Sequence, residues 1–218
     1  ERYVDARIRA RGVLLLSLPS TPLLLVPNRS FLAEETPPPK DPYRLPLAPI
    51  ATVLAKAFEV HLRHRVRIIG EVTYTDQESF FVQDASGAIR VKGHKQTGIN
   101  VGDTLELVGF PPGKEQAGTL TEPHWRVASN SQPVSPRELE FNVEQPFNQL
   151  GILVQVSGNL LSLRTNGSNQ ILELQEQHRI FTAVSTTSSG RFPDWIPGSR
   201  LQITGVCDDE AALAVPDP

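Results

Sequence analysis

The sequence predicts an all-β chain in which small barrels follow one another in tandem. Two kinds of strand-like segment recur along the chain, and each copy ends in glycine. Segments of alternating polarity lie at Arg7–Gly12, Arg65–Gly70 and Val154–Gly158. Segments in which a turn leads into a strand lie at Val101–Gly109 and Ile196–Gly205. Because the two kinds keep their order at a similar spacing, they indicate repeated domains rather than chance strand composition.

The middle repeat has the clearest pattern. In its first strand, the residues from Val66 to Tyr74 alternate between two faces. Four further strands are predicted at Phe80–Asp84, Ala88–Lys92, Thr104–Gly109 and around Trp125–Ala128. Short strands that follow one another around an apolar interior are typical of a small Greek-key barrel of the OB type. The predicted interior consists of Val66, Ile68, Val72, Phe80, Val82, Ile89, Val91, Leu105 and Leu107.

Proline-rich segments and short helices are predicted to join the barrels. The prolines between Pro37 and Pro49 predict a stiff, extended linker. The apolar residues between Ile50 and His61 recur at helical spacing, so we expect a helix that plugs one barrel end or packs between neighbours. A second helix is predicted before the last repeat, because Ser135–Glu138 has the pattern of a capping box with proline at the first helical position.

These elements divide the chain into three parts. Residues 1–48 form a partial OB-like repeat and the proline-rich linker, and residues 49–132 form a barrel with its leading helix. Residues 133–218 form a second barrel that stops early, because only Ala211–Val215 remains for its fifth strand. Since the chain begins at Glu1 and contains no methionine, we expect it to be a processed product or a fragment.

Composition and motifs argue against several functions. The chain has 21 basic and 24 acidic residues and a net charge of −3, whereas phosphate-binding surfaces usually show a basic excess. No glycine-rich phosphate loop, paired cysteine motif or catalytic constellation occurs in the sequence. His61 and His64 have metal-ligand spacing without a third ligand nearby, and Cys207 has no partner. We therefore expect no enzyme activity, no metal and no cofactor.

A candidate binding face follows from the barrel type. OB barrels commonly bind on the exposed face of their second and third strands. Phe81 with Arg90 and Lys92 would form a stacking platform beside positive charge there, with Arg67 on the neighbouring strand. The alternative is that Phe81 packs against the next barrel or the helix and that the basic residues are ordinary solvated side chains. Trp195 is a further candidate contact, with packing in a core or between domains as its alternative.

Several runs resemble a known family. The run His64–Gly93, followed by VGDTLELVGFP, the linker Asp41–Phe58 and the closing Pro197–Cys207 are similar to the extracytoplasmic OB-fold repeats of bacterial two-component (hybrid) sensor histidine kinases. The resemblance spans most of the chain. It implies an extracytoplasmic input region, followed by a membrane helix and a cytoplasmic kinase. It also implies a periplasmic or extracellular location as part of a membrane-anchored dimer.

The resemblance and the absent motifs together predict a non-catalytic sensor region. It would bind a small ligand or an extracytoplasmic protein and pass a signal to a kinase that lies outside this sequence. Two alternatives belong to other classes. One is an OB-fold protein that holds single-stranded nucleic acid, against which the charge balance argues. The other is an assembly or carbohydrate-binding module of an exported protein.

Overall fold

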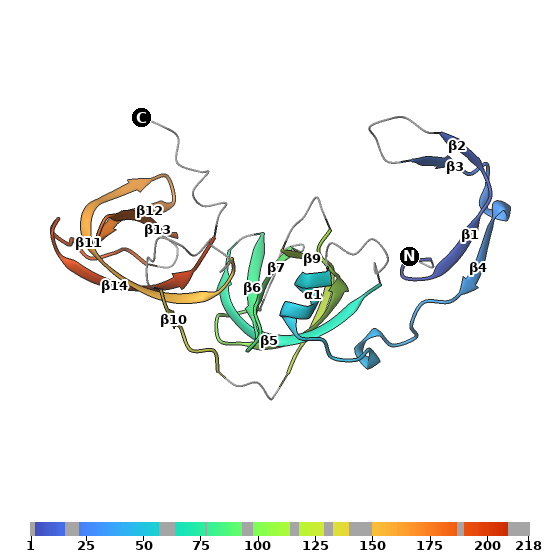
Figure 1. The fold of residues 1–218 in the computed structure, drawn as a ribbon, viewed down its shortest axis with the longest axis horizontal. Coiled ribbons are helices and arrows are strands. Elements are labelled where there is room, and N and C mark those ends of the chain that lie inside the picture. The colour runs from blue at the N-terminus through green and yellow to red at the C-terminus, as the bar shows by residue number, and fades with distance from the viewer. Residues whose placement is uncertain are drawn as a thin grey trace.

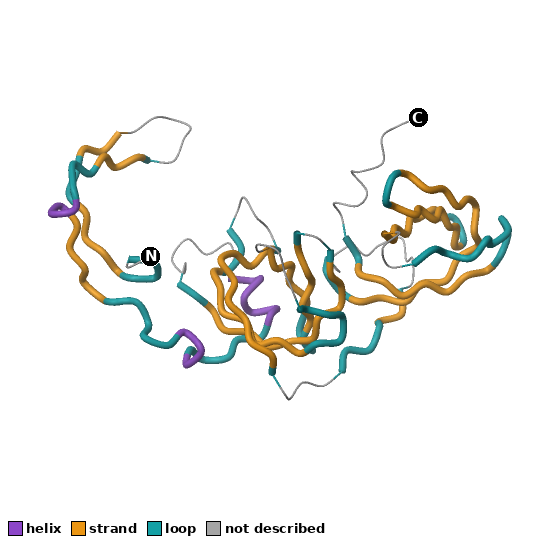
Figure 2. Tube along the Cα trace, turned by 180° about the vertical axis from the view of Figure 1, so that it is seen from behind, coloured by secondary structure: helices purple, strands orange, loops and turns teal. Residues whose placement is uncertain are grey.

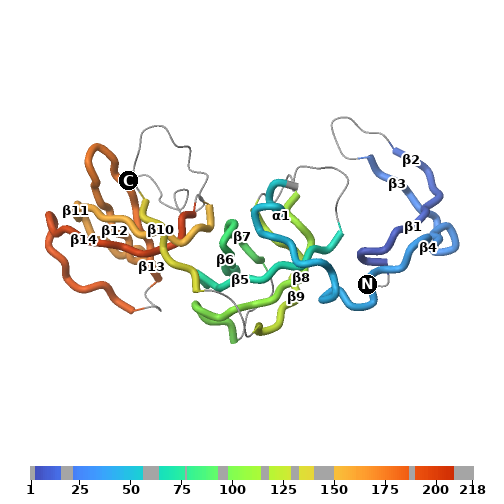
Figure 3. Tube along the Cα trace, turned by 60° about the horizontal axis from the view of Figure 1, so that its bottom comes forward, coloured from blue at the N-terminus to red at the C-terminus, as the bar shows by residue number. Residues whose placement is uncertain are grey.

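The computed structural model describes residues 3–15, 22–56, 64–76, 78–92, 98–113, 118–128, 133–139, 150–186 and 190–208. Strands dominate these residues, which confirms the all-β prediction. Three parts follow one another in a row: an arm made of the first four strands, a closed barrel, and an open curled sheet (Figures 1 and 3).

The arm consists of two antiparallel ladders. Strand β1 (Arg7–Ala10) pairs with β4 (Leu32–Thr36), and β2 (Val13–Leu15) pairs with β3 (Leu23–Leu25) at the far end of the arm (Figure 1). A short 3-10 helix, Arg29–Phe31, precedes β4. The predicted strand segment at Arg7–Gly12 is thus present as β1, and it pairs with β4. A partial barrel over residues 1–48 stays a prediction.

The barrel closes through five strands. They are β5 (Val66–Thr75), β6 (Ser79–Gln83), β7 (Ala88–Lys92), β8 (Thr104–Phe110) and β9 (Thr119–Val127). Their order around the barrel is β5-β6-β7-β9-β8, with β8 returning to β5. Every neighbouring pair is antiparallel except β7 and β9, which run parallel.

The alternating pattern of the sequence produces the barrel core. Eight of the predicted interior residues lie in one buried cluster, and Val66 packs against it. Trp125 meets the ring of Phe80 edge to face, with ring centroids 5.9 Å apart. Gly70 lets β5 bend against β6, because a Cβ there would lie 2.6 Å from the carbonyl oxygen of Gln83.

Helix α1 (Ile50–Lys56) plugs the barrel (Figure 2). Ile50 and Val53 belong to the barrel core. The turn between β6 and β7 supplies the missing partners of the first helical amides: the Ile50 amide donates to Asp84 Oδ2 at 2.9 Å and the Ala51 amide to Ser86 Oγ at 3.0 Å. The rest of the predicted helix, up to His61, lies outside the described residues. Among those that are described, no helix is long and apolar enough to cross a membrane.

The second sheet repeats the pairings of the barrel. Its strands are β10 (Arg137–Glu138), β11 (Leu153–Asn166), β12 (Asn169–Glu176), β13 (Arg179–Thr186) and β14 (Arg200–Val206). Strand β11 pairs with β12 and β14, and β12 pairs with β13, just as β5 pairs with β6 and β8, and β6 with β7. The described strands form an open sheet, and the predicted fifth strand, Ala211–Val215, lies outside the described residues.

The predicted helix at Ser135–Glu138 is wrong. Arg137 and Glu138 form β10, which pairs in parallel with β11 through Val154 and Gln155. The Leu139 amide continues this pairing by donating to the Gln155 carbonyl at 2.9 Å. A capping box satisfies only a few amides at a helix start, whereas the edge of β11 offers partners to the extended segment.

Candidate functional site at the junction of barrel and second sheet

The outward face of β6 and β7 is covered by the second sheet. Phe81 points out of the barrel, yet it is only 2% exposed. The guanidinium of Arg90 lies over its ring at 4.9 Å and forms an ion pair with Asp208, which follows β14. The predicted platform of Phe81 and Arg90 therefore exists as a stacked pair, and both residues contact other parts of the same chain.

Hydrogen bonds join the two parts across this junction. The backbone amide of Leu153, at the start of β11, donates to Gln83 Oε1 at 2.7 Å. The amide of Val134, in the connecting segment, donates to Glu71 Oε2 at 2.8 Å. Both acceptors belong to barrel strands, so the second sheet is attached at its entry point as well as at its last strand.

A small apolar cluster fills the centre of the junction. Ala88 of β7 packs with Ile152 and Val154 of the second sheet, with Leu139 and Cys207 beside them. Gly151 fits against the barrel because it has no side chain. A Cβ at this position would lie 2.9 Å from Phe81 Cδ1 and 3.1 Å from Ala88 Cβ. This glycine has a φ of 80°, which also disfavours any other residue.

The chemistry of the junction is that of a contact between domains. Burial raises the pKa of the Cys207 thiol. It also raises the pKa of Tyr74, with smaller contributions from the negative charges of Asp76 and Asp208. Both groups stay protonated near neutral pH, so neither is an activated nucleophile or base. Within the described ranges, no group of three histidine, cysteine or carboxylate side chains has the arrangement of a metal site.

The other predicted site residues lie apart from this junction. Lys92 is exposed at the end of β7, opposite Ser79. Trp195 belongs to the apolar cluster of the second sheet, where its ring lies 5.5 Å from that of Phe192. Arg67 donates to Glu106 and, at 3.0 Å, to the carbonyl of Leu45. The structure thus brings Phe81 and Arg90 together, leaves Lys92 exposed two residues further along β7, and places Arg67 and Trp195 in other clusters.

Arg67 takes part in a charged cluster on the barrel wall. Glu106 on β8, whose side chain is 7% exposed, also accepts from Arg126 Nε at 2.7 Å. Arg126 lies over the ring of Tyr43 at 4.5 Å. Burial by itself raises the pKa of Glu106, but the hydrogen bonds and charges of Arg126 and Arg67 hold this pKa below its ordinary value.

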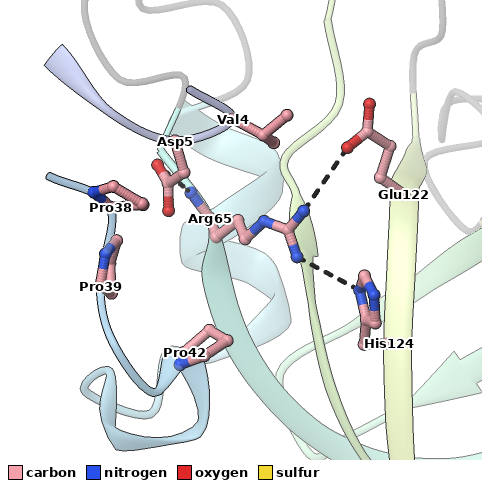
Figure 4. Close-up of a pocket in the computed structure, with 8 residues that line it drawn as sticks. All are labelled: Val4, Asp5, Pro38, Pro39, Pro42, Arg65, Glu122 and His124. Carbon is pink, nitrogen blue, oxygen red and sulfur yellow. Dashed lines mark hydrogen bonds and ion pairs between the residues drawn. The ribbon is translucent and has the colours of Figure 1, made fainter. Parts of the chain in front are cut away.

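A cavity of about 360 Å³ lies between the arm and the barrel (Figure 4). One side is lined by Val4 and Asp5, which precede β1, and by Pro38, Pro39 and Pro42 of the linker after β4. The barrel side is lined by Arg65, Glu122 and His124. Arg65 donates to His124 Nδ1 at 3.2 Å and lies 3.5 Å from Glu122 Oε2. These residues come from distant parts of the chain, and no sequence pattern pointed to them.

The junction residues Gly151 and Asp208 also escaped prediction from the sequence. Gly151 precedes the apolar run Ile152–Val154, but the sequence alone does not show which surface requires a glycine at this position. Gln83 and Asp208 lie at strand ends, where polar residues are common. Only the fold shows that they meet partners far away in the sequence.

No protein-family model matches the chain, and no curated protein matches it. A solved structure described as "Structural mimicry for functional antagonism" is similar to this chain, with a TM-score of 0.36 and 12% sequence identity. The similarity covers 69% of this chain and 87% of that chain. We draw no conclusion about fold or function from similarity at this level.

We predict that Glu106→Gln lowers the free energy of unfolding by about 1–3 kcal/mol at neutral pH, because it removes the charge between two arginines. Folding lowers the pKa of Glu106, so the carboxylate stabilises the fold above the ordinary glutamate pKa. This contribution is lost as the pH falls from the ordinary glutamate pKa through the lowered pKa of the folded state. Urea unfolding at neutral and acid pH should therefore show a difference from wild type that shrinks in acid. Glu78→Gln, at an exposed glutamate of the barrel, is the control, and an equal loss in both variants would contradict the assignment.

We predict that Gly151→Ala weakens the junction, whereas Gly198→Ala does not. Both glycines have positive φ, so alanine costs about 1–2 kcal/mol of backbone energy at either position. Only the Cβ at position 151 meets neighbours in the barrel, since Gly198 has open space around it. Hydrogen exchange of the Leu153 amide, measured by NMR, should accelerate in Gly151→Ala alone. Equal acceleration in both variants would mean that Gly151 does not seat the second sheet.

Proposed function

We propose that the chain is a non-catalytic, extracytoplasmic input region of a two-component sensor histidine kinase, and that it relays a signal as coupled OB-type barrels. The resemblance of its sequence runs to such regions supports this proposal. The kinase that would receive the signal belongs to a longer polypeptide.

The OB-type assignment is supported by the strand order. Five strands close as β5-β6-β7-β9-β8, and the parallel pair β7–β9 completes the ring. OB barrels are five-stranded Greek-key barrels. The second sheet has the pairings of the first four strands of the barrel, as the repeated sequence motifs led us to expect.

One observation carries the proposal: the face on which OB barrels commonly bind is occupied by the next part of the chain. Phe81 on β6 lies against Gly151, and Arg90 on β7 forms an ion pair with Asp208. A barrel that uses this face for its neighbour is suited to transmit a displacement. It is less suited to hold a nucleic acid strand there.

The linker before the barrel is fixed in the same way. The Ala48 amide donates to the Arg67 carbonyl at 2.9 Å, and the Arg67 side chain donates to the Leu45 carbonyl. The proline-rich segment therefore ends against the barrel instead of swinging freely. We infer that a ligand or partner shifts the angle between arm and barrel, while barrel and second sheet move as one block.

The alternatives have less support. Arg67, Arg90 and Arg126 would supply the charge of a nucleic-acid groove, but each forms an ion pair with a carboxylate of this chain. No observation favours a carbohydrate-binding module.

The receptor assignment predicts where the native protein is found. An antibody against this region should detect a membrane-bound polypeptide much longer than 218 residues after cell fractionation. A species without membrane association would contradict the receptor assignment.

In the same full-length receptor, Arg90→Ala should change kinase output, because it removes the ion pair to Asp208. Lys92→Ala is the matched control, since Lys92 lies on the same strand and is exposed. Output that responds to Lys92→Ala and not to Arg90→Ala would contradict the relay through this junction.

A further inference from the structure

Asp5, which lines the cavity between arm and barrel, has a buried carboxylate oxygen without a hydrogen-bond partner in the part of the chain that the structure describes. The side chain of Asp5 is 3% exposed. Its Oδ1 accepts from His64 Nδ1 at 2.9 Å and from the Arg65 amide at 3.3 Å. Its Oδ2 is buried and has no hydrogen-bond partner among the described residues. A charged oxygen in this state costs more free energy than one with a donor, so the site favours any ligand that brings one.

We propose that this cavity binds a small organic ligand through a primary ammonium group, which donates to Asp5 Oδ2. Figure 4 shows the Asp5 carboxylate between the proline rings and Arg65. Proline has no backbone N–H, so Pro38, Pro39 and Pro42 cannot supply the missing donor. This site is separate from the junction described above and does not depend on the proposed relay.

The polar groups of the barrel side are already engaged with each other. Arginine only donates, so the bond from Arg65 to His124 Nδ1 fixes His124 Nδ1 as the acceptor and places the proton of the neutral ring on Nε2. Arg65 also lies over the ring of Phe110 at 4.9 Å. Because these contacts hold Arg65 away from Asp5 Oδ2, the guanidinium does not satisfy it.

Charge and shape define the ligand class. The described lining residues carry two carboxylates, Asp5 and Glu122, and one guanidinium, that of Arg65, so they favour a cation over an anion. The three proline rings and Val4 offer apolar surface for a short alkyl chain. A volume of about 360 Å³ accommodates a short aliphatic amine.

The test uses putrescine as the probe and calorimetric titration of the whole chain as the measurement. We expect saturable binding of one putrescine per chain. Asp5→Asn should weaken it about tenfold or more, because the charge-assisted hydrogen bond is lost. Asp194→Asn, at an exposed aspartate in the segment before β14, should leave the affinity unchanged. The diol of the same chain length should not compete.

Two further results decide the proposal. If Asp5→Asn does not fold, Glu122→Gln takes its place, because the Glu122 side chain is 62% exposed and we expect the fold to tolerate its replacement. It should weaken putrescine binding severalfold. The absence of saturable binding, equal binding of the diol, or unchanged affinity in both cavity variants would each overturn the ammonium site.

Discussion

The burial of Phe81 against Gly151 is the constraint on which the rest of the structure depends. A barrel strand normally turns one face to solvent, but every residue of β6 is buried, since Phe80 lies inside and Phe81 is covered from outside. The second sheet can cover Phe81 only where a residue without a side chain approaches. That single approach aligns the amide of Leu153 with Gln83 and brings Asp208 to Arg90.

Arginine side chains of the barrel also make contacts within the chain. The barrel arginines are used inside the molecule: Arg67 and Arg126 hold Glu106, and Arg90 holds Asp208. The Arg90–Asp208 pair joins β7 to the segment after β14, and Arg67 also donates to the Leu45 carbonyl in the linker before the barrel. Electrostatics thus fixes the parts relative to one another, and little of this charge remains for a polyanionic partner. In the arm, by contrast, apolar side chains such as Leu14 and Leu25 are exposed.

The sequence predicted the barrel well because its interior follows a period of two, and its glycines and turns mark where strands bend or end. The interior from Ile68 to Leu107 and the start of α1 after Pro49 both follow from local patterns. The extended form of Ser135–Glu138 did not, because its pairing partner β11 lies outside the local signal. The junction and the cavity could not be predicted for the same reason: Arg90 and Asp208 are 118 residues apart, and Asp5 and Arg65 are 60 residues apart.

The central claim is that barrel and second sheet form one rigid block through the covered face of β6 and β7. Residual dipolar couplings of backbone amides, measured on the whole chain in a weakly aligning medium, test this claim most directly. If the junction holds, couplings from β5–β9 and from β11–β14 fit a single alignment tensor with the relative orientation seen here. Two tensors of different magnitude or orientation would show that the parts reorient independently, and would contradict the account.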